Sequence, residues 1–198
     1  MQTLPQLQAH VGAALNIGAS PLQLRETIYQ CAPYIGFPKT LNAIDIANGV
    51  FEANGISLPL ENAGTVDATD PSAREQAGAA IQAPLYGNEV KEVFSALPKP
   101  FDEFVPHLLT SSAFGDFATR GGLDVAQREL ISLVAIAAIG ATTQLRPHVA
   151  GAIRAGSSRQ KVAAALVHVM PYIGGPYALS GLVLVARYDE SASAEVYR

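Results

Sequence analysis

A glutamate and a histidine, Glu129 and His148, are the residues whose types and spacing could carry out proton transfer. Glu129 stands near the start of an apolar run that predicts a helix over 124–140, and His148 lies in the next expected helix. In an antiparallel hairpin, the two side chains would be separated by only about 4 to 7 Å along the helix axis. A carboxylate beside an imidazole fixes its tautomer for acid and base catalysis. The pattern alone also fits a solvated Glu129 and a histidine that only packs.

The helix over 124–140 is expected to form a core, because it is almost wholly apolar on every side from Leu130 to Ile139. An internal repeat predicts further helices that could surround this core helix. Residues 6–52 align without a gap with residues 144–190, so that His10 pairs with His148 at an offset of 138. Apolar residues recur every three or four positions in both copies, which predicts three helices in each and an all-α protein.

The repeat predicts two related helical units of unequal size. The first, 1–56, is expected to be incomplete, because no equivalent of the 124–140 helix precedes it. A segment rich in Gly, Pro, Asp, Asn and Thr, 57–72, is the expected linker, and 73–198 is the complete unit. Either the two units share one core helix or the reading frame begins late. Three further helices are expected after the linker, over about 72–83, 87–97 and 101–117.

The amino-acid composition excludes several classes of protein. Thirteen Lys and Arg oppose 17 Asp and Glu without a basic stripe, so a nucleic-acid partner is not expected. Only 15% of the residues are charged, so we expect apolar surface to meet another copy of the chain. The single cysteine, Cys31, cannot form an intrachain disulfide, and no Cys/His cluster has zinc spacing. With no signal peptide and no apolar stretch of membrane-spanning length, a soluble cytoplasmic protein without a bound metal is expected.

A series of motifs surrounds Glu129: Phe114-Gly115, Arg120-Gly-Gly-Leu123, Arg128-Glu129-Leu130, Leu145-x-x-His148-Val149, Gly156 and Tyr172-x-Gly174-x-Pro176. In order and spacing these motifs resemble the carboxymuconolactone decarboxylase family, which includes an alkyl hydroperoxidase D branch. The C-terminal half of the same domain resembles the first copy, which carries His10, Gly18 and Tyr34-Ile-Gly36-Phe-Pro38. The resemblance implies an all-α fold of two alkyl hydroperoxidase D-like units, the first incomplete.

Missing cysteines separate the two branches of this family. Members of the hydroperoxidase branch carry a Cys-x-x-Cys pair between the glutamate and the histidine, and here those positions are Ala141 and Gln144. Without two thiols there is no thiol/disulfide couple for peroxide reduction, so the decarboxylase branch is favoured. Two alternatives stay open, an antioxidant peroxidase that uses Cys31 and a non-catalytic helical assembly or ligand-binding protein.

The resemblance to the decarboxylase branch implies a lyase that needs no cofactor and acts on a small carboxylated, lactone-type substrate. It gives His148 the role of general acid and base and makes Glu129 its partner. Arg120 and Arg128 become the candidate anchors of the substrate carboxylates. Further candidates for substrate binding are Tyr34, Tyr172 and His10.

The resemblance also bears on His10 and on assembly. His10 is either retained for packing or part of a site completed by a carboxylate from another subunit. Because single-unit relatives form rings of six, a homo-oligomer of tandem chains is expected, a trimer or a dimer.

Overall fold

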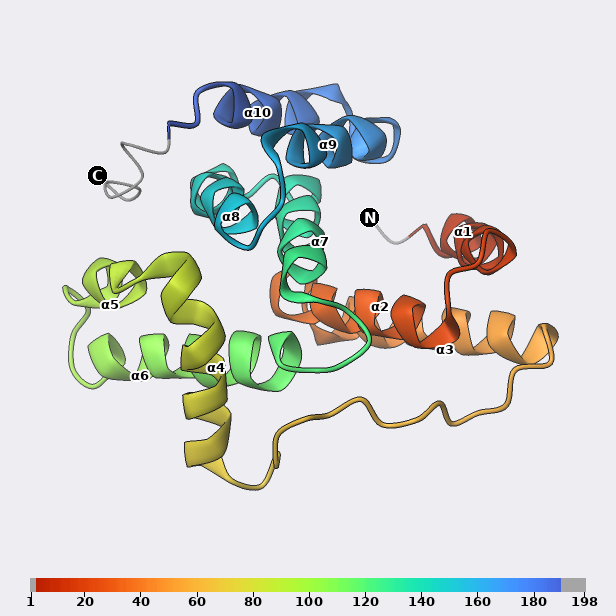
Figure 1. Cartoon of the computed structure of the whole chain (residues 1–198), viewed down its shortest axis with the longest axis horizontal. Helices are drawn as coiled ribbons and strands as arrows, with labels where there is room; N and C mark the ends of the chain where they lie inside the picture. Colours follow the sequence, from red (N-terminus) through yellow and green to blue (C-terminus); the bar gives the residue numbers. More distant parts are fainter. Residues whose placement is uncertain (1–2, 190–198) are drawn as a thin grey trace.

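The computed structural model describes residues 3–189, which form helices and connecting loops (Figure 1). No strand occurs within that range, so the all-α prediction is confirmed. The elements in chain order are α1 (Leu4–Asn16), α2 (Pro21–Ile35), α3 (Phe37–Ala53), α4 (Pro71–Tyr86), α5 (Glu89–Phe94), α6 (Phe101–Leu108), the π-helix η1 (Leu109–Ala118), α7 (Val125–Ala138), α8 (Thr142–Arg154), α9 (Arg159–Ile173) and α10 (Gly175–Ala186).

The first three and the last three helices begin at positions that the predicted repeat pairs. The pairs are α1 with α8, α2 with α9 and α3 with α10, and the first residues of each pair differ by 138 in number. The Ser20 and Ser158 side chains cap the middle helices by accepting from a backbone N–H. The same helices end at Gly36 and Gly174, whose φ angles of 86° and 91° favour glycine. The same local signals therefore act in both segments.

The segment predicted as one helix over 101–117 differs from the prediction, because it is divided between α6 and the π-helix η1. Two side-chain hydroxyls at the junction donate to backbone carbonyls four residues earlier, Thr110 to Pro106 and Ser111 to His107. Such bonds compete with the helical N–H groups for the same carbonyls. The wider turns of a π-helix follow this junction, and they end where the Thr119 N–H donates to the Phe114 carbonyl, five residues back.

Helix α7 lies at the centre of the helical arrangement (Figure 1). One of its faces carries Leu133 and Ile136, which are buried against Leu145, Val149 and Leu166 of α8 and α9. Helix α7 also packs on α2 from the first predicted unit, through Arg128 and Ser132. Helix α7 therefore contacts elements of both predicted units, whose boundaries at 56 and 73 stay predictions. Among residues 3–189, no helix is both long enough and apolar enough to cross a membrane.

Candidate active site

The hairpin of α7 and α8 brings Glu129 and His148 together, with 3.4 Å between Oε2 and Nδ1. Helix α7 begins at a capping box in which the Asp124 carboxylate accepts from the Gln127 N–H at 2.7 Å, and the Gln127 side chain accepts from the Asp124 N–H at 2.9 Å. This cap fixes the start of α7, so the position of Glu129 one turn later follows from local sequence.

A tyrosine from another helix lies between these two side chains. The hydroxyl of Tyr86, the last residue of α4, donates to Glu129 Oε2 at 2.5 Å and lies 2.8 Å from His148 Nδ1. Helix α4 approaches η1 closely through Gly78, where a Cβ would lie 2.8 Å from the Gly115 nitrogen. Helix α4 also contacts α8, and its last residue, Tyr86, reaches the α7–α8 hairpin. Sequence reasoning missed Tyr86, because no spacing rule links it to residues 43 and 62 positions away.

We call these three residues, Tyr86, Glu129 and His148, the Tyr86 relay, and their hydrogen bonds indicate which atoms carry a proton. A tyrosine hydroxyl holds one proton, and here it is donated to the carboxylate of Glu129. The Tyr86 oxygen then accepts from the N–H at Nδ1 of His148. In the neutral imidazole this leaves a lone pair on Nε2, which has no hydrogen-bond partner among residues 3–189. Nε2 is therefore the atom that can exchange a proton with a bound molecule.

The Tyr86 relay is largely shielded from solvent. The side chains of Glu129 and His148 are 4% and 14% exposed, and Tyr86 is 3% exposed. Space for the hydroxyl comes from Gly151 on α8, where a Cβ would lie 2.5 Å from the Tyr86 oxygen and 3.0 Å from Glu129 Oε2. The relay therefore requires glycine at this point of α8, and the imidazole is the most accessible member of the relay.

Tyr34 of α2 packs against the imidazole of His148. Its ring meets the His148 ring edge to face, with 5.5 Å between the centroids and an angle of 87°. Burial, together with the charge of Glu129, raises the pKa of Tyr34 well above its usual value. Tyr34 is therefore a neutral hydroxyl beside the imidazole at physiological pH.

His10 in the first repeat segment also packs on a tyrosine ring, but no glutamate pairs with it in the described part of the chain. His10 meets Tyr172 with 5.1 Å between ring centroids and an angle of 85°, so each histidine packs on the tyrosine of the other repeat segment. Tyr172 is 62% exposed, and within residues 3–189 no carboxylate forms an ion pair with His10. Of the predicted site residues, His148 and Tyr34 therefore lie together beside Glu129. His10 and Tyr172 form a separate pair.

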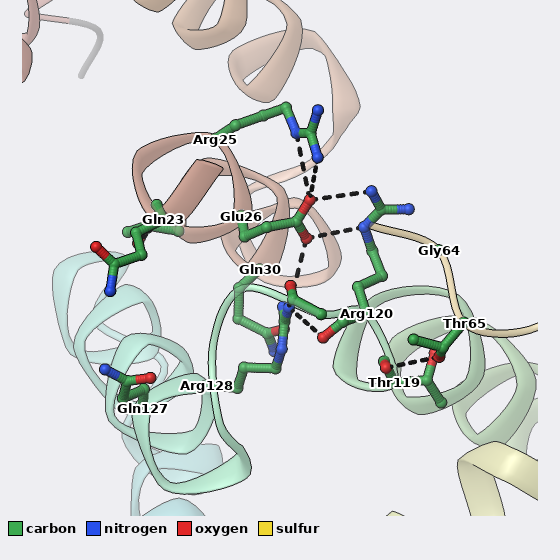
Figure 2. A network of polar contacts seen from close by, with 12 residues as sticks. Gln23, Arg25, Glu26, Gln30, Gly64, Thr65, Thr119, Arg120, Gln127 and Arg128 are labelled. Carbon is green, nitrogen blue, oxygen red and sulfur yellow. Dashed lines mark hydrogen bonds and ion pairs between the residues drawn. The ribbon is translucent and has the colours of Figure 1, made fainter. Parts of the chain in front are cut away.

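The two candidate anchors lie around Glu26 of α2 (Figure 2). Arg120 holds its carboxylate with two bonds, Nε to Oε2 at 2.8 Å and Nη2 to Oε1 at 3.0 Å. Arg128 is 1% exposed, with Nη2 3.4 Å from Glu26 and Nη1 donating to Gln30 at 3.0 Å. Neither arginine has an ion pair with Glu129. Sequence reasoning missed Glu26, whose carboxylate draws both guanidinium groups toward α2.

The charge state of Glu26 is set by two opposing effects. Burial alone would raise its pKa, but hydrogen bonds from Arg120 and Arg25, together with their positive charges, outweigh burial and hold the pKa of Glu26 below 4.5. The carboxylate is fully enclosed, with a side-chain exposure of 0%. Glu26 is therefore a buried anion that the folded protein keeps ionised.

The lowered pKa of Glu26 predicts a loss of stability in acid. A carboxyl whose pKa is lower when folded contributes stability above its unfolded pKa, and this contribution is lost as the pH falls through the folded value. We expect the free energy of unfolding in urea to fall below about pH 4.5, the unshifted value. In Glu26→Gln the decrease over the same range should be smaller. Equal slopes in both proteins would contradict this assignment.

Comparison with known proteins shows which family the chain resembles. Residues 1–49 and 105–187 match the sequence profile of the carboxymuconolactone decarboxylase family. A nitrosuccinic acid decarboxylase of Metarhizium robertsii is 28% identical over 110 residues, which cover 56% of this chain and 77% of that relative. Glu129 and His148 lie in the matched residues, whereas Tyr86 lies between the two matched regions. Because the matched regions make up more than half of the chain, it belongs to the carboxymuconolactone decarboxylase family.

Proposed function

We propose that this protein is a decarboxylase that needs no cofactor and uses His148 as its proton donor. The observation that carries the proposal is the Tyr86 relay, in which a buried carboxylate acts on the imidazole through a tyrosine hydroxyl. Family membership and the related nitrosuccinic acid decarboxylase support the type of reaction. Tyr34 is the proposed wall of the substrate site.

The proposed substrate is a small carboxylate with an electron-accepting group close to the carbon that bears the carboxylate. A lactone carbonyl is one such acceptor, and the name of the relative suggests a nitro group as another. As the C–C bond breaks, CO2 leaves and its electron pair stays on the carbon, delocalised into the acceptor. The imidazolium of His148 then donates its Nε2 proton to that carbon, and solvent returns a proton to the imidazole. One proton is consumed for each CO2 released.

The relay supports this step by stabilising the charged imidazole. When His148 is protonated, its Nδ1–H donates to the Tyr86 oxygen and the Tyr86 hydroxyl donates to the Glu129 carboxylate, so the negative charge of Glu129 lies one residue away. Arg120 and Arg128 are outside this proposal, because Glu26 holds both of them.

The reaction can be tested directly on the purified protein. We expect it to release CO2 from nitrosuccinate or from carboxymuconolactone without added metal or cofactor, with one proton taken up per turnover. CO2 is measured by a coupled assay and proton uptake by a pH indicator. Failure to turn over either compound would contradict the proposal.

Peroxidase activity through Cys31 is the alternative with a specific test. Burial raises the pKa of the Cys31 thiol to about 11, and the sequence holds no second cysteine to resolve an oxidised thiol. We therefore expect Cys31 to react with Ellman's reagent at pH 8 at least tenfold more slowly in the native protein than in urea. Cys31→Ser, which should behave like the wild type with peroxide, is the control. Fast native labelling together with loss of peroxide turnover in this variant would favour the alternative.

We also propose a homo-oligomer, a trimer or a dimer, which light scattering in solution would test. Large apolar side chains remain exposed on several helices, among them Phe37 and Leu41 on α3, Phe101, Phe104 and Leu108 on α6, and Tyr177, Leu179 and Val183 on α10. A monomer at micromolar concentration would contradict this part of the proposal.

A further inference from the structure

Three arginines surround Glu26 on α2, and a fourth arginine and its carboxylate partner line the same cavity as Arg120. Arg25, Arg120 and Arg128 contact Glu26, and Arg74 pairs with Asp116. Among residues 3–189, no third carboxylate forms an ion pair with any of these arginines. The cluster thus carries two more positive than negative charges, although the net charge of the whole chain is −4.

Two of these arginines keep unused donors. Arg25 and Arg120 contact Glu26 through Nε and Nη2, and Nη1 of each has no hydrogen-bond partner in the part of the chain that the structure describes. Figure 2 shows the third nitrogen of each guanidinium pointing away from the Glu26 carboxylate. Their Nη2 atoms lie 2.9 and 3.0 Å from the same oxygen of Glu26, so the two cations are close neighbours.

The ring of Tyr29 contacts the guanidinium groups of both Arg25 and Arg120. The guanidinium carbons of Arg25 and Arg120 lie 5.5 and 5.1 Å from the centroid of the Tyr29 ring. Contact with an aromatic face holds a guanidinium in place while its N–H groups stay available for hydrogen bonds. The donors are therefore positioned before any ligand arrives.

Open space lies beside these donors. Two adjoining cavities, of about 590 and 530 Å³, share Tyr29, Ile44, Asn62 and Arg120 as walls, and we call them together the Arg120 groove. Phe37, Leu41 and Phe117 add an apolar wall. None of the three residues of the Tyr86 relay lines either cavity.

The linker closes one side of the Arg120 groove. It is held by two long-range bonds, in which the Gly121 N–H donates to the Ala63 carbonyl and the Thr65 hydroxyl donates to the Thr119 carbonyl, both at 2.8 Å. Figure 2 shows Gly64 and Thr65 passing beside Arg120. The groove is therefore a fixed feature of the fold, with a charged end and an apolar wall.

We propose that the Arg120 groove binds a small carboxylate with an apolar body, at a site separate from the Tyr86 relay. The ligand carboxylate accepts hydrogen bonds from Nη1 of Arg25 and Arg120 and from the side-chain amide of Asn62. Charge-assisted bonds of this type are stronger than neutral ones, and the ligand charge offsets the excess of positive charge. The apolar body lies against Ile44 and Phe117. The inference is independent of the proposed decarboxylation.

Benzoate is a suitable probe, and benzamide is its uncharged match in size and shape. In a titration of the ¹⁵N-labelled full chain, benzoate is expected to shift the amide resonances of Gly64, Thr65 and Gly121 in a saturable way at millimolar concentration. Benzamide should bind at least about tenfold more weakly, because the charge-assisted bonds are lost. Equal binding of both probes, or no shift at these amides up to 20 mM benzoate, would overturn the proposal.

Variants test the named contacts. Asn62→Ala changes a linker side chain outside the Glu26 cluster, so it should fold normally and weaken benzoate binding severalfold. Arg25→Met should weaken it about tenfold or more, with Arg146→Met, an exposed position on α8, as the unchanged control. Unaltered affinity in a folded Asn62→Ala would count against the proposal even if Arg25→Met unfolds.

A competition titration distinguishes the possible sources of a natural ligand. If the natural ligand is an effector separate from the reaction, the shifts that benzoate induces near Gly64 stay unchanged when a substrate analogue is added. If the natural ligand is a substrate or product of the protein, the analogue competes with benzoate and reduces these shifts. Benzoate shifts that appear instead beside Tyr86 and His148 would show that the carboxylate site is the relay itself, and would reject a separate groove site.

Discussion

His148→Gln is expected to lower the rate of CO2 release by about 10²- to 10⁴-fold, the usual contribution of a positioned general acid. Glutamine keeps a polar side chain of similar length, but it cannot hold a transferable proton at neutral pH. Tyr86→Phe should give a smaller loss, of about tenfold or more, because Glu129 and His148 stay within 3.4 Å of each other without the bridging hydroxyl. The measurement is kcat with the substrate that the wild type turns over.

Two further variants make this result specific. His168→Gln changes an exposed histidine on α9 that has only a ring contact with Tyr172, and its kcat should match the wild type. Gly151→Ala retains every member of the Tyr86 relay but places a methyl group 2.5 Å from the Tyr86 oxygen, so kcat should fall while helix content is unchanged. If His148→Gln kept full activity, the proposed decarboxylation mechanism would be rejected. A ligand-binding role would instead leave affinity unchanged in a Glu129→Gln, His148→Gln double variant.

Glu26→Ala is expected to lower the free energy of unfolding by about 3 to 5 kcal/mol, because it leaves buried guanidinium groups without their carboxylate. Such a loss is a large part of the about 5 to 15 kcal/mol that a domain usually has. Arg128 is affected most, since its exposure is 1% and it cannot turn to water. Urea unfolding followed by circular dichroism measures the change.

Asp116→Ala is the matched control for this prediction. It also removes the carboxylate partner of an arginine, but the side chains of Arg74 and Asp116 are 27% and 29% exposed. Solvent can replace the lost partner there, so the expected loss is about 1 kcal/mol or less. Similar losses in the two variants would show that burial of Glu26 does not determine its contribution.

Local signals in the sequence predicted most helices. The all-α fold followed from apolar spacing, and the cap at Asp124 marks the start of α7 within one residue of the predicted helix. The helix expected over 87–97 is present only as Glu89–Phe94. The π-helix was not predicted, because it depends on which carbonyls the hydroxyls of Thr110 and Ser111 reach.

Local sequence signals also predicted only some of the residues of the candidate site. The approach of Glu129 to His148 could be estimated, since both lie on one hairpin with a short turn. Tyr86 and Glu26 could not be placed, because their positions depend on how α4 and α2 pack against α7. The family resemblance made Arg120 and Arg128 candidate substrate anchors, and their spacing carries no information about Glu26, a carboxylate on a distant helix. The catalytic roles remain predictions for the variants above.

The contacts between α2 and α7 also bear on how far the chain can be divided. Arg128 and Ser132 of α7 take their polar partners, Glu26 and Gln30, from a helix that the sequence assigns to the other unit. A fragment beginning at residue 73 would keep the relay residues and yet expose an uncompensated arginine on its central helix. The two segments resemble each other in sequence, but the arginines of one pair with Glu26 of the other, so we expect neither to fold stably by itself.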